Sequence, residues 1–224
     1  MSGAREREAL PPLVGGILVG GASRRMGSAK ALLEWHGETF VERITTALTT
    51  VVPEVVLLGS PPALPPALAG LQVIDDLPGA CGPLAGVLAA LAARPGAAWL
   101  IVTCDQPLLQ TATLAWLIAR RQIDRIAVLP RLVPGRIEPF PGIYEPGCRA
   151  ALAAIAAHAP GVANAAGAGR GRGGSLQPLG GLADVRIAPV PRALRGALRG
   201  VNTAAEWAAL RKQAERAAKD PGGD

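Results

Sequence analysis

The sequence has few of the residues that build metal clusters or disulfide frameworks. Its three cysteines, Cys81, Cys104 and Cys148, lie far apart and form no Cys-x-x-Cys pair. Only two histidines accompany them, so the chain offers no zinc-ligand spacing. Sparse, scattered cysteines are typical of proteins in a reducing compartment, and we expect a cytoplasmic location.

Long hydrophobic runs and an apolar leader are also missing. The longest apolar stretch, 83–103, is interrupted by Arg94, Pro95 and Gly96, which is unlike a membrane span. The first twelve residues carry two acidic side chains and lack the apolar region of a signal peptide. We therefore expect no membrane contact. We also expect flexible termini at 1–12 and 219–224 around a single domain at 13–210.

Aromatic side chains make up only 3% of the chain, whereas the formal net charge is +6. Positive charge attracts polyanions, but binding of single-stranded nucleic acid also needs aromatic side chains on which bases stack. The Gly/Arg-rich stretch 169–174 occurs as one short copy, which we interpret as a solvated loop. An RNA-binding module is therefore the least favoured alternative, and we expect no nucleic-acid partner.

Short apolar runs alternate with stretches of helical periodicity along the chain. Strands are predicted at 14–19, 54–59, 71–74, 98–103, 126–129, 140–144 and 185–190. Helices are predicted at 40–51, 84–93, 111–118, 148–158 and 204–218, with Thr203 and either Thr111 or Thr113 as N-caps. This alternation favours a three-layer α/β/α, Rossmann-like fold with a mostly parallel sheet. Ligands of such sheets bind at the carboxyl ends of the strands.

The stretch 20–30, GGASRRMGSAK, directly follows the first predicted strand. Its glycines let the backbone pass close beneath a ligand and tolerate positive φ angles. Backbone N–H groups and three cations can then surround the phosphates of a nucleotide. The segment therefore predicts a phosphate-binding loop.

Two common phosphate loops do not fit this stretch. The Walker loop needs a lysine directly after a glycine, but Lys30 lies three positions after Gly27 and no Ser or Thr follows it. The dinucleotide loop needs an acidic residue at the end of the second strand, where this chain has Gly59 and Ser60.

A third pattern, L-x-G-G-x-S-x-R-M-G-x-x-K, does fit. Its matches are Leu18, Gly20, Gly21, Ser23, Arg25, Met26, Gly27 and Lys30. The pattern resembles the signature loop of nucleotidyltransferases with a GT-A-like fold, the nucleotide-diphospho-sugar transferase type. Arg25 can contact phosphate oxygens in a bidentate manner, and Lys30 can place charge where negative charge develops during transfer.

Later motifs follow in a fixed order. They are G-P-L-A-G at 82–86 after Asp75 and Asp76, C-D-Q-P at 104–107, F-P-G-I-Y at 140–144, and Asn202-Thr203. Together with the loop they resemble the molybdenum cofactor guanylyltransferase family. Enzymes of that family transfer GMP from Mg²⁺-bound GTP to the phosphate of molybdopterin and release pyrophosphate.

The resemblance implies roles for individual residues. The residues implied to bind the nucleotide or second substrate are Leu18, Gly20, Gly21, Ser23, Lys30, Asp75, Asp76, Gly82, Gly86 and Asn202. Asp75 or Asp76 would lie near the base or ribose, and Gly82 and Gly86 would shape the guanine pocket. Asn202 would lie near the second substrate or the metal. Asp105 would bind Mg²⁺, and it would act in catalysis with Arg25 and Lys30. The implied partners are GTP, molybdopterin and, transiently, apo-molybdoenzymes or chaperones.

Three positions depart from the family pattern. Ala29 stands where many members have aspartate, Val19 replaces alanine, and Gly200 stands where the late motif usually has asparagine. A molybdopterin cytidylyltransferase, another sugar- or alcohol-phosphate nucleotidyltransferase and a non-catalytic molybdopterin-binding paralogue are therefore alternatives. The Gly-Gly pair in the loop, together with G-P-L-A-G, favours guanine.

Overall fold

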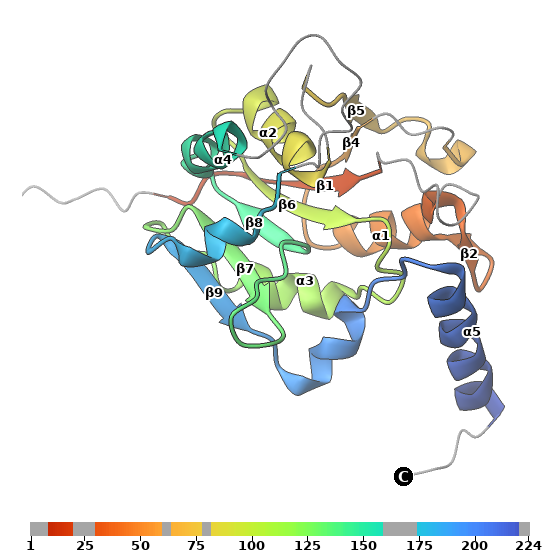
Figure 1. Cartoon of the computed structure of the whole chain (residues 1–224). Coiled ribbons are helices and arrows are strands. Elements are labelled where there is room, and N and C mark those ends of the chain that lie inside the picture. The colour runs from red at the N-terminus through yellow and green to blue at the C-terminus, as the bar shows by residue number, and fades with distance from the viewer. Residues whose placement is uncertain (1–8, 20–29, 60–63, 78–81, 159–173, 220–224) are drawn as a thin grey trace, which may run out of the picture.

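A computed structural model describes residues 9–19, 30–59, 64–77, 82–158 and 174–219, with the backbone alone described at 30 and 214–219. Its central feature is a seven-stranded sheet, shown in Figure 1, with the order β5-β4-β1-β6-β8-β7-β9. The strands are β1 (Leu13–Leu18), β4 (Val55–Leu58), β5 (Gln72–Ile74), β6 (Ala98–Thr103), β7 (Ala127–Arg131), β8 (Gly142–Tyr144) and β9 (Val185–Pro189).

All neighbouring strands of this sheet pair in parallel except around β8, which is antiparallel to both β6 and β7. Strand β1 lies in the middle of the parallel half, with Leu18 beside Leu58 of β4 and Thr103 of β6. The predicted mostly parallel sheet is therefore confirmed, with one reversed strand.

Four helices cover the two faces of the sheet. They are α1 (Phe40–Thr49), α2 (Pro83–Ala93), α3 (Thr111–Ile118) and α4 (Cys148–Ala157). Helices α2 and α4 cover one face of the sheet, at its upper left in Figure 1, and α1 and α3 cover the other face, at its lower right. A fifth helix, α5 (Ala204–Lys219), extends away from the sheet.

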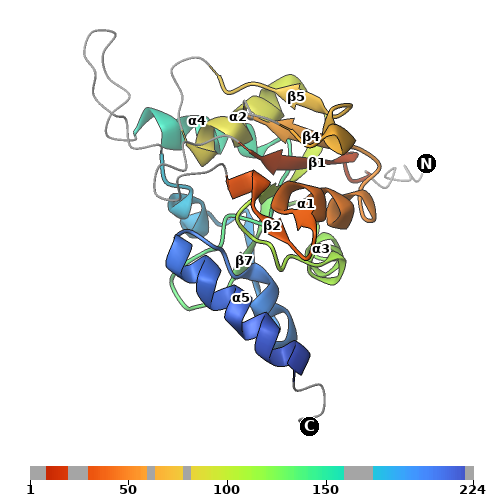
Figure 2. The ribbon, with the colours of Figure 1, turned by 90° about the vertical axis from the view of Figure 1, so that its right-hand side faces the viewer.

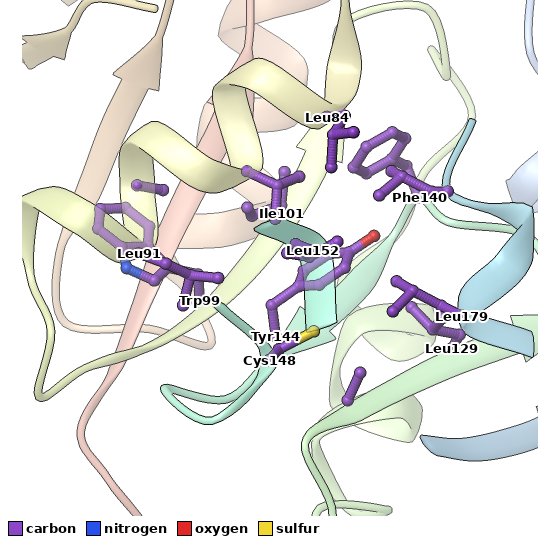
Figure 3. Packing of buried hydrophobic residues seen from close by; sticks show 14 of the residues in the cluster. Leu84, Leu91, Trp99, Ile101, Leu129, Phe140, Tyr144, Cys148, Leu152 and Leu179 are labelled. Carbon is purple, nitrogen blue, oxygen red and sulfur yellow. The ribbon is translucent and has the colours of Figure 1, made fainter. Parts of the chain in front are cut away.

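Two hydrophobic clusters fill the spaces between these layers. Side chains alternate between the two faces of a strand, so Trp99 and Ile101 of β6 enter one cluster and Leu100 and Val102 enter the other. Figure 3 shows the first cluster, in which Leu84 and Leu91 of α2 and Leu152 of α4 lie over β6 and β8. The predicted three-layer fold is thus confirmed by the packing.

Several short elements escape sequence-based prediction. A hairpin of β2 (Glu34–Trp35) and β3 (Glu38–Thr39) precedes α1, and its turn has positive φ angles at His36 and Gly37. Two-residue strands are too short to show periodicity. The 3₁₀ helices are η1 (Lys30–Leu32), η2 (Pro66–Leu68), η3 (Gln177–Gly181) and η4 (Arg192–Leu198).

The two predicted N-caps have different outcomes. Thr203 does cap α5, because its hydroxyl accepts a hydrogen bond of 3.1 Å from the Glu206 backbone N–H. The prediction for α3 is wrong: its N-cap is Gln110, whose side chain makes no capping hydrogen bond. The Thr111 hydroxyl contacts the Thr50 hydroxyl at 3.0 Å instead, and Thr113 is fully buried.

A buried ion pair lies at the edge of the sheet where β1 begins and the reversed strand β8 ends. Arg121 donates to both carboxylate oxygens of Glu145 at 2.7 and 2.9 Å, and the two side chains are 8% and 7% exposed. Arg121 also donates to the Pro11 carbonyl just before β1. Within the described ranges, no helix has both the length and the apolar character needed to cross a membrane.

Candidate active site

The carboxyl ends of β1, β4, β5 and β6 lie at one edge of the sheet, because these strands run parallel. Hydrogen bonds connect the segments that leave this edge: Val19 N–H donates to the Leu58 carbonyl, and Gly59 N–H donates to the Ile74 carbonyl. Most of the predicted site residues follow these strand ends. Among the described residues, Leu18, Asp76 and Gly86 form one cluster, and Asp105 and Asn202 form a second.

The first cluster brings together Leu18, Asp76 and Gly86. A Cβ atom added at Gly86 would overlap Leu18 Cδ2 and would lie 3.6 Å from the Asp76 carboxylate Oδ1. Glycine therefore lets α2 pack this closely over the end of β1 without displacing the Leu18 side chain. The predicted guanine-pocket glycine and one of the two predicted acidic residues are thus neighbours in space.

Asp76 has a perturbed carboxyl group although its side chain is exposed. Partial desolvation by surrounding atoms and the like charge of Asp75 both raise the pKa of Asp76 above its ordinary value. The charged form of such a carboxylate gains from hydrogen-bond donors on a ligand. Guanine N–H groups and ribose hydroxyls are donors of this kind.

Gly82 forms the turn into α2. It is the N-cap residue of this helix, with φ of 74° and ψ of −172°, a conformation that L side chains rarely adopt. Pro83 follows at the first helical position, where its lack of an N–H group is tolerated. The contact between Gly86 and Leu18 places the start of α2 at the same edge of the sheet as Leu18. The backbone N–H groups of the first turn of α2 lie at that edge.

The second cluster joins Asp105, just after β6, to residues just before α5. The Thr103 hydroxyl donates to Asp105 Oδ1 at 2.6 Å, and the Val201 N–H donates to the Asp105 carbonyl at 2.7 Å. A Cβ added at Gly200 would lie 3.6 Å from Asn202 Nδ2 and 4.0 Å from Asp105 Cγ. Two predicted site residues from distant parts of the sequence therefore flank the same glycine.

Glu206 fixes the segment that carries Asn202, and this role escaped the sequence analysis. Its carboxylate Oε2 accepts hydrogen bonds from the backbone N–H groups of Asn202 at 2.6 Å and Thr203 at 2.9 Å. With the reciprocal bond from Glu206 N–H to the Thr203 hydroxyl, this is a capping box. The T-x-x-E spacing before an Ala-rich run is the signal that would have revealed it.

An aromatic cluster holds α5 beside the hairpin. The ring centroid of Trp207 lies 5.2 Å from that of Trp35 and 5.0 Å from that of Phe40. In the view of Figure 2, α5 extends below the sheet next to β2. The segment that follows the predicted phosphate loop is thereby attached to the segment that follows Asn202.

Most of the predicted phosphate loop lies outside the described residues. This applies to Gly20, Gly21, Ser23 and Arg25. Lys30 begins η1, directly before the hairpin, and its side chain is not described. The roles expected of these residues stay predictions.

The described residues suit a metal site that the substrate completes. They contain no group of three or more His, Cys, Asp and Glu side chains that could hold a metal ion alone. Mg²⁺ usually takes one or two carboxylates and fills its other positions with water and phosphate oxygens. The Asp105 carboxylate, oriented by the Thr103 hydroxyl at the strand end, fits this pattern.

Comparisons with known sequences point to one family. Residues 15–170 match the description "MobA-like NTP transferase domain". A probable molybdenum cofactor guanylyltransferase of Pelotomaculum thermopropionicum is 37% identical over 145 residues, which span 64% of this chain and 69% of that protein. A protein of the same description from Halalkalibacterium halodurans is 31% identical over 148 residues, spanning 63% of this chain and 74% of its own.

Solved structures share the fold at low sequence identity. Molybdopterin-guanine dinucleotide biosynthesis protein A of Archaeoglobus fulgidus superposes with a TM-score of 0.67 at 19% identity, covering 91% of this chain and 99% of that chain. A 2-C-methyl-D-erythritol 4-phosphate cytidylyltransferase of Thermus thermophilus gives 0.59 at 17% identity, covering 92% and 100%. The fold is therefore common to transferases with different nucleotides and acceptors.

Proposed function

Because this chain belongs to the MobA-like NTP transferase family and is thus a nucleotidyltransferase, we propose that it transfers GMP from GTP to the phosphate of molybdopterin. The products are molybdopterin guanine dinucleotide and pyrophosphate. One observation carries the proposal: the Leu18–Asp76–Gly86 cluster and the Asp105–Asn202 cluster lie at the same edge of the sheet. The names of the relatives that are 31–37% identical support the choice of substrates.

The first cluster suits the nucleoside part of GTP. Gly86 lets α2 pack closely over the end of β1, and the Asp76 carboxylate beside it accepts hydrogen bonds from the base or the ribose. The first turn of α2, which begins after Gly82, adds backbone N–H groups beside this cluster. The triphosphate then extends toward the loop 20–30, where Arg25 and Lys30 are proposed to bind its oxygens.

The second cluster suits the reacting groups. An oxygen of the molybdopterin phosphate attacks the α-phosphorus of GTP, a new P–O bond forms, and the bond to the pyrophosphate breaks. The attacking oxygen is already anionic, so the reaction needs no strong general base. The chain contributes positioning and charge neutralisation, with Asn202 beside the second substrate. When bound, Mg²⁺ supplies positive charge to the phosphates, and Asp105 would hold it.

Pyrophosphate release with GTP, Mg²⁺ and molybdopterin tests the proposal, with mass spectrometry to identify the dinucleotide. We expect GTP to be used far better than CTP. Asp105→Ala should lose at least about a hundredfold in kcat while keeping its fold. The matched control is Asp124→Ala, an exposed aspartate that pairs with Arg125.

Other results would favour the alternatives. Preference for CTP would make the chain a cytidylyltransferase, and the absence of pyrophosphate with either nucleotide would favour a non-catalytic molybdopterin-binding paralogue. Normal turnover of Asp105→Ala would remove that residue from the metal site. Transient contact with apo-molybdoenzymes or chaperones stays a prediction.

A further inference from the structure

Gln106, the residue after Asp105, lies where three segments of the carboxyl edge meet. Its side chain is buried, with the residue only 7% exposed. The side-chain Nε2 donates to the Phe140 carbonyl at 2.9 Å and to the Leu198 carbonyl at 3.3 Å. Phe140 leads into β8, and Leu198 ends η4 four residues before Asn202. One amide therefore connects the ends of three separate elements.

The partners of Gln106 determine how its amide is oriented. Both are backbone carbonyls, which only accept hydrogen bonds, so the NH₂ group must face them. The opposite atom, Oε1, is buried and has no partner among the described residues. A buried amide that leaves its acceptor unused is costlier than an apolar side chain of the same length. The benefit of glutamine at this position therefore lies in the two carbonyls that it holds.

These bonds act on the segment that carries Asn202. The stretch 198–201 is attached to the end of β6 at two points: Leu198 through the Gln106 amide and Val201 through its N–H bond to the Asp105 carbonyl. Val201 itself is 1% exposed. Asn202 follows immediately and is exposed. Removing the amide would therefore loosen the Leu198 end of this segment, while the Val201 bond and the Glu206 capping box remain.

We propose that Gln106 is a positioning residue for the transfer reaction. It does not contact substrate; it fixes the segment 198–201 and thereby holds Asn202 opposite Asp105, where the phosphate-bearing second substrate is presented to the nucleotide. This inference rests on the proposed function. It predicts an effect on the second substrate and little effect on GTP, because the Gln106 side chain bonds to Phe140 and Leu198 and, in the part of the chain that the structure describes, not to the Asp76–Gly86 cluster.

Gln106→Met tests this, since methionine keeps the length of the side chain and removes both hydrogen bonds. We expect the KM for molybdopterin to rise about tenfold, which corresponds in free energy to the net contribution of about one hydrogen bond. The Kd for GTP should stay within about twofold of the wild-type value. Gln110→Met is the matched control, because Gln110 is exposed and its side chain makes no capping hydrogen bond. Circular dichroism during thermal unfolding monitors the fold.

A double-mutant cycle with Asn202→Ala separates positioning from general loosening of the structure. If Gln106 acts through Asn202, Gln106→Met adds no further rise in KM to the Asn202→Ala variant. An additive rise, an unchanged KM or an equal rise in the GTP Kd would overturn the proposal. If Gln106→Met does not fold, the same cycle is run with Gln106→Asn, whose amide is too short to reach both carbonyls.

The wild-type protein distinguishes the two possible failures. Active wild-type enzyme with an additive cycle would overturn the role of Gln106 alone. A wild-type protein that releases no pyrophosphate with GTP and molybdopterin would overturn the proposed function and this inference with it.

Discussion

Replacing Gly86 by alanine should weaken GTP binding more than it weakens the fold. The added methyl group would overlap Leu18 Cδ2, an atom of a side chain that is only 9% exposed and belongs to the core under α2. Either Leu18 or α2 must move to restore an ordinary contact. The same methyl group would lie 3.6 Å from Asp76 Oδ1, so the movement changes the Leu18–Asp76–Gly86 cluster that we assign to the nucleoside.

Two opposing terms set the effect on stability. Overpacking of a core contact costs about 1–3 kcal/mol. Alanine is about 1 kcal/mol more favourable than glycine inside a helix, which offsets part of this cost. We therefore expect the free energy of unfolding to fall by about 0–2 kcal/mol, which lowers the Tm by a few degrees in a domain of this size.

The effect on binding should be larger, because a shift of Leu18 or α2 also displaces the surroundings of the Asp76 carboxylate that we assign to the nucleoside. We expect the Kd for GTP, measured by calorimetry with Mg²⁺, to rise at least about tenfold, or about 1.4 kcal/mol. The matched control is Gly96→Ala, because a Cβ at Gly96 meets no atom within 4 Å. Unchanged GTP affinity in a folded Gly86→Ala protein would refute the assignment of this cluster to the nucleoside.

Two further predictions concern charges at opposite edges of the sheet. Arg121→Met leaves Glu145 buried without its partner, so the free energy of unfolding, measured in urea, should fall by about 3–5 kcal/mol. The affinity of the folded protein for GTP should stay unchanged. A fall in the free energy of unfolding of less than about 1 kcal/mol would contradict this prediction. Because the pKa of Asp76 is raised in the folded state, the folded state binds its proton more tightly, and stability should rise as pH falls through the acid range just above the ordinary pKa of aspartate. Asp76→Asn should reduce the slope of the free energy of unfolding against pH, measured by denaturation across this acid range. An unaltered slope would contradict the raised pKa of Asp76.

The sequence was sufficient to predict the elements whose signal is local. Strand β6 is a continuous apolar run, and its side chains enter both hydrophobic clusters, as expected for a strand buried on both faces. Helix α1 shows its apolar face at helical spacing and begins with a Thr39–Glu42 capping box. The placing of Asp105 after a central strand follows from the same reasoning.

The contacts that complete the site could not be predicted in this way. Gln106 bonds to carbonyls that lie far from it along the chain, and no spacing rule connects it to Phe140 or Leu198. Similarly, the pair Asp75-Asp76 gives no local sign of which carboxylate lies beside Gly86. That choice depends on how the segment after β5 packs against α2, which is a tertiary effect.

The reversed direction of β8 has a consequence for how such proteins diversify. The other central strands have their carboxyl ends at the candidate site, whereas β8 has its amino end there. The loop 132–141, which connects β7 to β8, therefore lies at the same edge of the sheet as the site. This loop follows β7 and is connected to the Asp105 half through the Phe140 carbonyl. Its buried residues Ile137 and Phe140 belong to the hydrophobic cluster that also contains Leu18, whereas residues 133–136 are exposed. The exposed part, 133–136, can therefore change in length and composition, in evolution or by protein engineering, to admit a different acceptor while the buried residues that support the nucleotide half are kept.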